Sequence, residues 1–362
     1  FRIIDLAANA GSVGSQAYTL DTTAPTSTSA VIAVSGTGGA NDGDIVTLTL
    51  DPSETVGTPT CTWTDGSGAM EDTSVTYGTT GSDSHTAAVT VDNADQDGSV
   101  GFSCTYSDVA GNAIASAITS ATSGSVTIDN THPTSTSAVL AVGGSGDGNN
   151  GDDVTLTLNP SEDVGTPTCT FTSGGAGMAN TVSYSTTGDD SHVATIAVAD
   201  GDTNGAVAFS CTYSDSAGNA IATAITAASS GAVTIDNTHP TASAVTIAVT
   251  GTGNGNDADV VTLTIDPSEA IGAPTCTFTS GGAAMGDSSV TYATVGGTDH
   301  HTAAVTVGDG DTDGAVAFSC TFSDSAGNSV TSAVTALTAG SAITIDNTHP
   351  TLSIVMSTNG NT

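Results

Sequence analysis

The sequence predicts an all-β chain of tandem antiparallel β-sandwich domains, about seven strands each, joined in a linear array. Two observations predict this fold class. First, a short motif recurs at intervals of about 108 residues: SDVAGN ends at Asn112, and SDSAGN ends at Asn219 and Asn328. Second, apolar residues alternate with Thr and Ser in short runs separated by Gly, Asp and Asn. A period near 108 residues is typical of domain-sized units that each have their own core, not of solenoid repeats.

A second motif sets the expected domain boundaries. THP ends at Pro133, Pro240 and Pro350, and the variant TAP ends at Pro25. We therefore predict three full repeats: repeat 1 at 23–130, repeat 2 at 131–237 and repeat 3 at 238–347. Residues 1–22 are expected to be the carboxy-terminal fragment of a preceding repeat, and residues 348–362 the first strand of a following one. On this interpretation the sequence is a piece of a longer protein.

Each predicted strand of repeat 1 is a run of alternating apolar and polar residues. Lettered A to G in chain order, the strands are expected at 30–34, 44–50, 60–64, 74–77, 85–91, 99–106 and 125–128. Val, Ile and Thr dominate these runs, which favours strands, and no stretch has a helical apolar period with capping residues.

Two cysteines fall in each repeat, on the expected C and F strands. The pairs are Cys61 with Cys104, Cys169 with Cys211, and Cys276 with Cys320. Each Cys shares its strand face with neighbouring aromatic residues, which is the core face. This pattern favours one disulfide within each repeat and an oxidising, extracellular compartment. The alternative is a pair of buried, reduced thiols. Antibody domains bridge strands B and F instead, so the expected bridge differs from theirs.

The composition limits the classes of partner. The chain has 37 acidic residues and one basic residue, Arg2, for a formal charge of −36. This charge excludes nucleic-acid binding through phosphates and disfavours anionic membranes. No run of about 18 apolar residues is present, so this segment has no predicted membrane span. The charge favours cations as partners, because solvent ions or bound metal must offset the repulsion between the acids. Adaptation to salty water, without a specific site, is the alternative.

Three motifs of repeat 1 together resemble a known family. DTTAPT at 21–26, PSE at 52–54 followed by Val56, and DVAGN at 108–112 are similar to motifs in the tandem bacterial Ig-like domains of large repetitive surface adhesins. The resemblance implies an Ig-like sandwich, secretion to the cell surface, a role in the shaft of an adhesin or fibre, and, as in many relatives, calcium bound where domains meet. The sequence departs from the family in its disulfides, its lack of Lys and Arg, and its His at 132, 239 and 349.

The loop between strands E and F resembles the first half of an EF-hand calcium loop, in which alternate oxygen-bearing side chains surround one cation. The candidate ligands are Asn93, Asp95 and Asp97 in repeat 1, Asp200, Asp202 and Asn204 in repeat 2, and Asp309, Asp311 and Asp313 in repeat 3. The second half of the motif fails, because a Cys stands where an EF-hand has Glu. The alternative is a tight Asp-Gly or Asn-Gly turn whose side chains form local hydrogen bonds.

A second candidate calcium site lies at the junctions between repeats. In a seven-strand sandwich, the linker leaving one repeat should meet the B–C turn and the F–G loop of the next. The acids expected to converge are Asp129, Glu162 and Asp215 at the first junction, and Asp236, Glu269 and Asp324 at the second. Carboxylates from two repeats around one Ca²⁺ would stiffen the junction. The alternatives are an Asx turn for the F–G Asp and a turn before Pro for the linker Asp.

No constellation points to catalysis, so we expect that the protein is not an enzyme. The strand histidines His85, His192 and His301 are expected to lie on the surface. The expected function is an extracellular structural repeat region that forms a stiff, calcium-rigidified rod of a surface adhesin or fibre. Its partners are the neighbouring repeats of the same chain. The alternative is a self-assembling subunit of an extracellular filament, sheath or flagellar appendage, whose partners are copies of itself.

Overall fold

The computed structural model describes residues 17–355, except residues 82, 145, 189, 288 and 296–299. Most of the predicted fragment 1–22 and about half of the fragment 348–362 therefore lie outside the described residues. The chain forms two compact units. The first contains the described part of Phe1–Ser135 together with Pro160–Pro167 and Thr212–Ala224 of repeat 2. The second contains Thr136–Asn159, Thr168–Cys211 and the described part of Ile225–Thr362.

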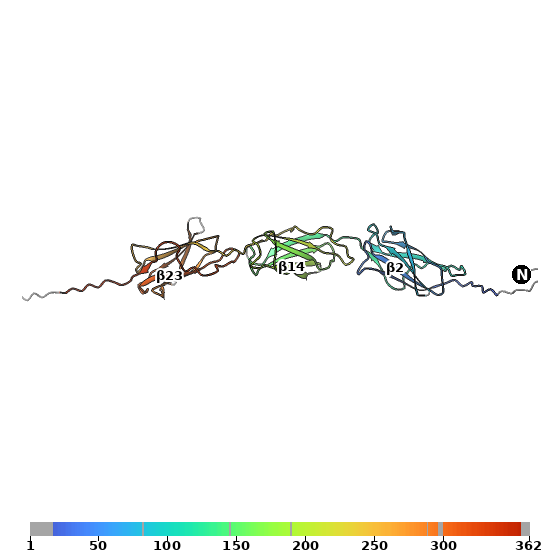
Figure 1. Cartoon of the computed structure of the whole chain (residues 1–362), viewed down its shortest axis with the longest axis horizontal. Coiled ribbons are helices and arrows are strands. Elements are labelled where there is room, and N and C mark those ends of the chain that lie inside the picture. Colours follow the sequence, from blue (N-terminus) through green and yellow to red (C-terminus); the bar gives the residue numbers. More distant parts are fainter. Residues whose placement is uncertain are drawn as a thin grey trace, which may run out of the picture. The chain divides into compact units, whose positions relative to one another are not determined.

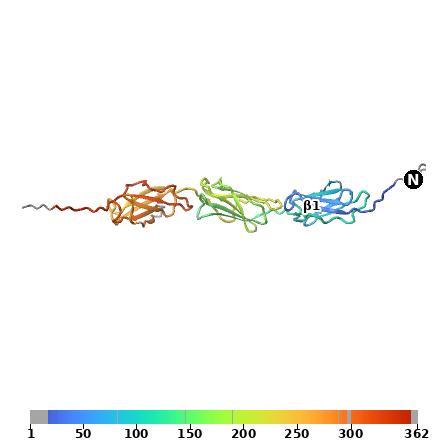
Figure 2. The same ribbon diagram turned by 90° about the horizontal axis from the view of Figure 1, so that it is seen from below.

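The described strands of repeat 1 form antiparallel sheets in the order expected for an Ig-like domain. They are β1 (Ser27–Val34), β2 (Ile45–Pro52), β3 (Thr60–Thr64), β4 (Thr76–Thr80), β5 (Ser84–Thr90), β6 (Gly98–Ser99), β7 (Gly101–Thr105) and β8 (Thr127–Ile128). One sheet has the order β1-β2-β5-β4, while β3 pairs with β7 and β6 pairs with β8. Figure 1 labels β2, and Figure 2 labels β1, its neighbour in the sheet. In letters, the sheets are A-B-E-D and C-F-G, the arrangement of a constant-type Ig domain.

The later repeats form the same sheets. Repeat 2 contains β9 (Ser135–Val142), β10 (Asp153–Pro160), β11 (Thr168–Ser173), β12 (Ala176–Gly177), β13 (Ser183–Thr187), β14 (Ser191–Ala197), β15 (Gly205–Thr212) and β16 (Thr234–Ile235). Repeat 3 contains β17 (Ala242–Val249), β18 (Val260–Pro267), β19 (Thr275–Ser280), β20 (Ala283–Ala284), β21 (Thr291–Val295), β22 (His300–Thr306), β23 (Gly314–Thr321) and β24 (Thr344–Ile345). Their orders are β13-β14-β10-β9 with β12-β11-β15-β16, and β17-β18-β22-β21 with β20-β19-β23-β24. The fold-class prediction is confirmed. Across the described residues, no helix has the length and hydropathy that a bilayer crossing requires.

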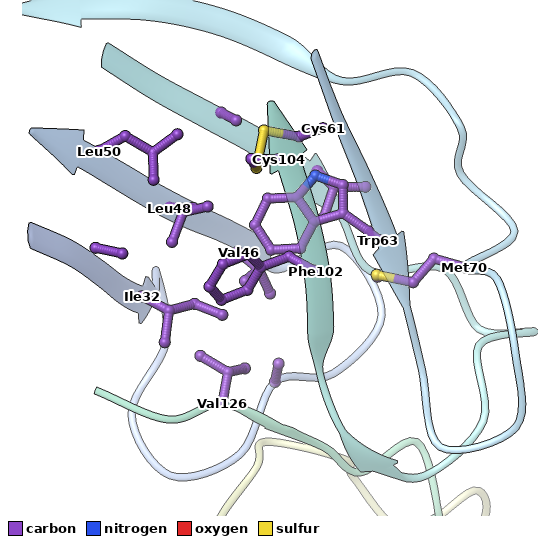
Figure 3. Close-up of a cluster of buried hydrophobic side chains, with 14 of the residues drawn as sticks. Ile32, Val46, Leu48, Leu50, Cys61, Trp63, Met70, Phe102, Cys104 and Val126 are labelled. Atoms are coloured by element: carbon purple, nitrogen blue, oxygen red, sulfur yellow. A yellow bond between two sulfur atoms is a disulfide. The ribbon is translucent and has the colours of Figure 1, made fainter. Parts of the chain in front are cut away.

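The core of repeat 1 lies between the two sheets. Alternation along β2 turns Val46, Leu48 and Leu50 inward, and all three are fully buried. They face Trp63 and Phe102 of the other sheet, whose ring centroids are 6.1 Å apart (Figure 3). Burial of each such aliphatic side chain contributes about 1.5–3 kcal/mol. Separate clusters of buried apolar residues form in repeats 2 and 3.

The three predicted disulfides are present: Cys61–Cys104, Cys169–Cys211 and Cys276–Cys320. Cys61 on β3 lies directly opposite Cys104 on β7 in the strand register, and Cys276 on β19 lies opposite Cys320 on β23. Each bridge therefore joins neighbouring C and F strands within one sheet, rather than clamping the two sheets together. The sulfur atoms nevertheless face the core, beside Trp63 in repeat 1 (Figure 3).

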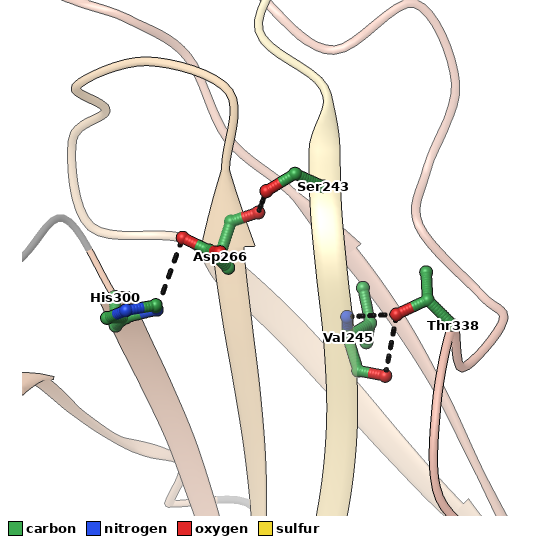
Figure 4. Close-up of polar contacts among 5 residues, drawn as sticks. All are labelled: Ser243, Val245, Asp266, His300 and Thr338. Atoms are coloured by element: carbon green, nitrogen blue, oxygen red, sulfur yellow. Dashed lines mark hydrogen bonds and ion pairs between the residues drawn. The ribbon is translucent and has the colours of Figure 1, made fainter.

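The prediction that the strand histidines lie on the surface is wrong. His85, His192 and His301 are only 7–8% exposed. They occupy inward positions near the strand ends, where His85 pairs with the buried Leu50 and His301 with the buried Ile265. The neighbouring His300 points outward and its side chain is 40% exposed; its Nδ1 lies 3.2 Å from Asp266 Oδ1 (Figure 4). The inward–outward alternation of β22 therefore includes the two histidines at its start, with His301 facing inward and His300 facing outward.

The segment between strands F and G is longer and less regular than predicted. In repeat 1 the seventh strand is only β8, Thr127–Ile128, and not the whole of 125–128. Before it, the chain makes isolated backbone bonds to both sheets: Cys104 N donates to Ile118 O at 3.0 Å, and Ile32 N donates to Ser123 O at 3.1 Å. The start of this segment is the F–G loop, which contains the repeated SDxAGN motif.

Candidate metal centres

Three equivalent groups of acidic side chains gather in the described structure. Each has one carboxylate oxygen per residue within 4.8 Å of the others. They are the amino-terminal triad (Asp21, Glu54 and Asp108), the first-seam triad (Asp129, Glu162 and Asp215) and the second-seam triad (Asp236, Glu269 and Asp324). Every triad combines a linker Asp, a Glu of the B–C turn and an Asp of the F–G loop. The first seam lies wholly within the first compact unit, and the second within the second unit.

The two seam triads are the junction sets that the sequence predicts, and the structure brings each set together. The amino-terminal triad was missed by the sequence analysis. The signal for it was available, because Asp21 begins the motif DTTAP and so stands at the position of Asp129 in DNTHP. Glu54 and Asp108 likewise occupy the positions of Glu162 and Asp215 in their repeats.

The F–G loop positions its aspartate through its own backbone. Asp215 Oδ1 accepts hydrogen bonds from Gly218 N at 2.8 Å and Asn219 N at 2.9 Å. Gly218 has a φ of 103°, which only glycine adopts readily. This is the local turn that the sequence offered as the alternative to a metal site. The turn and the triad coexist, because the backbone bonds fix the carboxylate in the place where the other two acids approach it.

An asparagine side chain then ties the F–G loop to the linker of the preceding repeat. Asn219 Nδ2 donates to Asp215 Oδ2 and to Asp129 O, both at 2.8 Å. Asn328 Nδ2 makes the same two bonds at the second seam, to Asp324 Oδ2 at 2.9 Å and to Asp236 O at 2.7 Å. The sequence analysis recognised this asparagine only as part of a motif, because its partner lies about 90 residues earlier in the chain.

The linker histidine adds a second direct bond across each seam. His132 Nδ1 lies 2.8 Å from Ala220 O, and His239 Nδ1 lies 2.7 Å from Ser329 O. A carbonyl oxygen only accepts, so Nδ1 carries the hydrogen in both cases. These bonds give a structural role to the histidines that depart from the family pattern. Neither His belongs to a triad.

The F–G loop also packs closely against the preceding repeat. A Cβ atom on Gly38 would lie 2.1 Å from Ser216 O, and a Cβ on Gly146 would lie 2.7 Å from Ser325 O. Ala217, at the centre of the first-seam loop, is buried, whereas its counterpart Ala110 in repeat 1 is exposed. The seams are therefore held by direct protein contacts.

Burial and then mutual repulsion raise the pKa of the triad glutamates. For Glu162, partial burial has the largest effect, and the charges of Asp129, Asp215 and Asp97 raise the pKa further. Burial, Asp236 and Asp324 raise the pKa of Glu269, and His239 lowers it. Burial, Asp21 and Asp108 raise the pKa of Glu54. Arg2, the one basic residue of the chain, lies outside the described residues, so these acids have no described Lys or Arg partner. A bound cation would relieve the repulsion.

The donor set fits a hard divalent cation. Ca²⁺ binds oxygen ligands at about 2.3–2.6 Å, so ligands on opposite sides of the ion are about 4.6–5.2 Å apart. All nine triad side chains offer oxygen, and the three oxygens of each triad lie no more than 4.8 Å apart, a separation that two ligands of one such ion can span. In addition, Glu269 Oε1 of the second-seam triad is buried without a hydrogen-bond partner. Buried oxygens in this state are costly unless something else binds them.

The E–F loop residues do not converge in the same way. The central aspartates Asp95, Asp202 and Asp311 are buried, and both of their oxygens accept backbone N–H bonds. For Asp95 the donors are Glu71 N at 2.7 Å and Asp92 N at 2.8 Å. The first-position residues, Asn93, Asp200 and Asp309, are exposed. This geometry matches the tight-turn alternative in part: one oxygen of each central aspartate bonds the backbone of its own loop, and the other bonds the segment that follows strand C.

The third-position residues of the E–F loops contact the linker instead. Asp97 Oδ1 accepts from Asn130 N at 2.7 Å, Asn204 Oδ1 from Asn237 N at 2.8 Å, and Asp313 Oδ1 from Asn347 N at 2.6 Å. The side-chain amides of the same linker asparagines donate to E–F loop carbonyls. The loop therefore fixes the linker that carries Asp129 or Asp236. The sequence analysis took the alternate acids as a cation loop; in the structure the Oδ1 atoms of these residues accept linker N–H groups, and the cation loop stays a prediction.

No family model matches the chain, and no curated protein matches it. Similar solved structures include the I-band fragment I67–I69 from titin, at 11% identity and a TM-score of 0.35, covering 86% of this chain and 98% of that one. A tetra-tandem repeat in the extending region of a large adhesion protein has 17% identity and a TM-score of 0.28, covering 96% and 80%. The ectodomain of mouse nectin-like molecule 4, Ig1–Ig3, has 12% identity and a TM-score of 0.25, covering 84% and 97%. By its strand order the chain is a tandem Ig-like β-sandwich protein, and the solved structures similar to it are tandem Ig-like repeats of structural or adhesion proteins.

Proposed function

We propose that this chain is an extracellular spacer region of a surface adhesin or fibre, in which calcium stiffens the seams between Ig-like repeats. The observation that carries the proposal is the convergence of Asp129 from one repeat with Glu162 and Asp215 from the next. A cation bound by all three would resist rotation at the seam, because rotation would break its coordination. The equivalent second-seam triad would act in the same way.

The covalent structure supports an extracellular location. Each repeat has one disulfide, and disulfides persist in oxidising compartments. The surface has many acids and no described Lys or Arg, which suits an environment where divalent cations are abundant. Extracellular calcium-binding modules typically have Kd values of about 10⁻⁴–10⁻³ M, so partial saturation at physiological calcium is expected.

The seams combine two kinds of restraint. Asn219 and His132 bond the two sides of the first seam directly, and these bonds need no metal. The metal would restrict the motion that these bonds still allow between the two sides of the seam, because it would remove the repulsion between the three acids. We therefore expect stripped seams to be looser but not unfolded.

The surface favours a spacer over a self-assembling filament subunit. Among the described residues, the large apolar side chain exposed at the same position in all three repeats is a tyrosine of the D strand: Tyr77, Tyr184 and Tyr292. Its hydroxyl accepts a bond from the backbone N of Cys61, Cys169 or Cys276, at 2.8–2.9 Å. These tyrosines hold an edge strand in place within the repeat. A lateral interface would need a larger apolar patch in every repeat.

Small-angle scattering of the full chain tests the proposal. Wild type is compared in calcium and in EGTA with a variant that carries Glu162→Gln and Glu269→Gln, which keeps the side-chain shape but lowers the charge at both seams. We expect calcium to narrow the wild-type distance distribution and to lengthen its maximum, and the variant to respond only at higher calcium. A wild-type distribution that is identical in calcium and in EGTA would refute calcium stiffening. Concentration-dependent self-association in sedimentation would favour the filament subunit.

A further inference from the structure

The two seams differ at one equivalent position of the E–F loop. Each of the two residues, Asp97 and Asn204, is followed by a glycine at the end of the loop, Gly98 or Gly205. Both also hold the linker in the same way, through Oδ1 and the backbone N of Asn130 or Asn237. The geometry of the linker is thus preserved, while a negative charge in the first seam is replaced by a neutral amide in the second.

The second side-chain atom of this residue acts differently on the linker acid. In the second seam, Asn204 Nδ2 donates to Asp236 Oδ1 at 2.9 Å, and Thr238 N also donates to that oxygen, at 3.0 Å. In the first seam, Asp129 Oδ1 accepts from Thr131 N at 3.1 Å, and Asp97 Oδ2 accepts from the Thr131 hydroxyl. The amide therefore takes up Oδ1 of the second-seam linker acid, whereas in the first seam no E–F loop side chain is bonded to Asp129 Oδ1 among the described contacts, so a cation at the second triad would share Asp236 with an additional hydrogen bond.

The charges that act on Glu162 and Glu269 also differ, and they too favour cation binding at the first seam. The charge of Asp97 acts on Glu162, but no E–F loop residue acts on Glu269. Glu162 is followed by Asp163, where Glu269 is followed by Ala270. The second seam also has acids that the first lacks, including Asp147 at the position of Gly39 and Asp200 at the position of Asn93, but both side chains are exposed and neither charge is among those that act on Glu269.

On these contacts, and on the calcium role proposed above, we propose that Asp97 and Asn204 grade the two seams, so that the first-seam triad fills at lower free calcium than the second. Calcium affinity rises with the number of charges near the ion. One further carboxylate at the edge of the site, screened by solvent and salt, is expected to change the midpoint about tenfold. A chain of this kind would stiffen one seam at a time as calcium rises.

Reciprocal exchange of the two residues tests the proposal in the full chain. The variants are Asp97→Asn and Asn204→Asp, each of which keeps the Oδ1 acceptor that holds the linker. Hydrogen–deuterium exchange of the F–G loop peptides, 214–220 for the first seam and 323–329 for the second, is measured across free calcium concentrations. This readout reports both seams separately in one molecule. Thermal unfolding in EGTA checks that the variants remain folded.

We expect protection of 214–220 at about tenfold lower calcium than protection of 323–329 in wild type. Asp97→Asn should raise the first midpoint alone, and Asn204→Asp should lower the second alone. Calcium-dependent protection with equal midpoints, or with midpoints that neither variant moves, would overturn the grading but leave calcium stiffening intact. Protection that does not depend on calcium at either loop would overturn the proposed function and the grading together.

Discussion

The side-chain amide of Asn219 donates a 2.8 Å hydrogen bond to the backbone oxygen of Asp129, which lies 90 residues earlier in the chain. The same nitrogen donates to the carboxylate of Asp215, 2.8 Å away. One buried asparagine therefore orients two members of the first-seam triad at once, the linker acid through its backbone and the F–G acid through its carboxylate. Asn328 does the same at the second seam.

Removal of this amide should loosen one seam. Asn219→Ala leaves Asp129 O and one oxygen of Asp215 without their donor, which should cost about 1–2 kcal/mol of local stability. Hydrogen exchange of the linker peptide 129–134 measures the effect. The matched control is Asn112→Ala. The Asn112 amide donates to Asp21 O at 3.2 Å, so it makes the equivalent bond beside the amino-terminal triad. Equal exchange of 129–134 in both variants would contradict this role.

Replacing a seam glycine by alanine should show whether close packing at the seam matters, apart from the cost of placing alanine at a positive φ. Gly38, Gly146 and Gly253 all have positive φ, between 93° and 104°, so replacement by Ala carries a similar conformational cost at each. The new Cβ would clash with Ser216 O at Gly38 and approach Ser325 O at Gly146, but at Gly253 it meets nothing within 4 Å.

Gly38→Ala should therefore displace the loop 214–220, and Gly146→Ala the loop 323–329, whereas Gly253→Ala should displace neither. Protection of the two loop peptides in hydrogen exchange measures the result. If Gly253→Ala loosened a seam as much as Gly38→Ala, the effect would belong to the backbone and not to the packing.

Loss of a disulfide should destabilise only the repeat that contains it. The bridge Cys61–Cys104 closes a separation of 43 residues, which corresponds to about 4 kcal/mol by chain entropy. Trp63, the one tryptophan of the chain, packs in the same core and reports on repeat 1 alone (Figure 3). We expect the double variant Cys61→Ala/Cys104→Ala to lower the unfolding midpoint seen by Trp fluorescence. The control Cys169→Ala/Cys211→Ala should leave that midpoint nearly unchanged, and an equal loss in both would mean that the repeats unfold together.

Acid should remove the contribution of Asp65 to the stability of repeat 1. Backbone N–H bonds from Gln96 and Ser67 have the largest effects and lower the pKa of Asp65 from 3.8 to about 2. A depressed folded-state pKa contributes stability above pH 3.8, and this contribution is lost as the pH falls to about 2. The difference in Trp63 unfolding midpoint between wild type and Asp65→Asn should therefore be present at pH 6 and shrink toward pH 2. A difference that does not change with pH would show that hydrogen-bond geometry, and not charge, gives the effect.

The strand plan and the seam triads could be read from the sequence because both follow from local pattern and topology. Alternation placed Leu48 and Trp63 on opposing inner faces, and the lettered strands placed Glu162 and Asp215 in loops at the same end. The register of Cys61 opposite Cys104 follows from the same strand assignments. The strand plan and the cysteine register are set within one repeat, whereas each seam triad also needs the linker acid of the preceding repeat.

Sequence reasoning reaches its limit where a side chain has more than one partner of suitable chemistry. Alternate acids at Asp95 and Asp97 fit a cation loop as well as they fit the backbone N–H groups that they bond in the structure, and the sequence pattern does not choose between the two. His85 is polar by composition but lies at an inward position of its strand, where register outweighs polarity. The bond from Asn219 to Asp129 has no sequence signature, because it depends on how two repeats meet.

The placement of the disulfides has a mechanical consequence. Each bridge joins adjacent strands whose cysteines are 42–44 positions apart in the sequence. If tension pulls a repeat apart, that enclosed stretch cannot be drawn out, so about 140–150 Å of contour is withheld per repeat. Reduction would release it, and the redox state of the surroundings would thereby set how far the tether can stretch before it breaks.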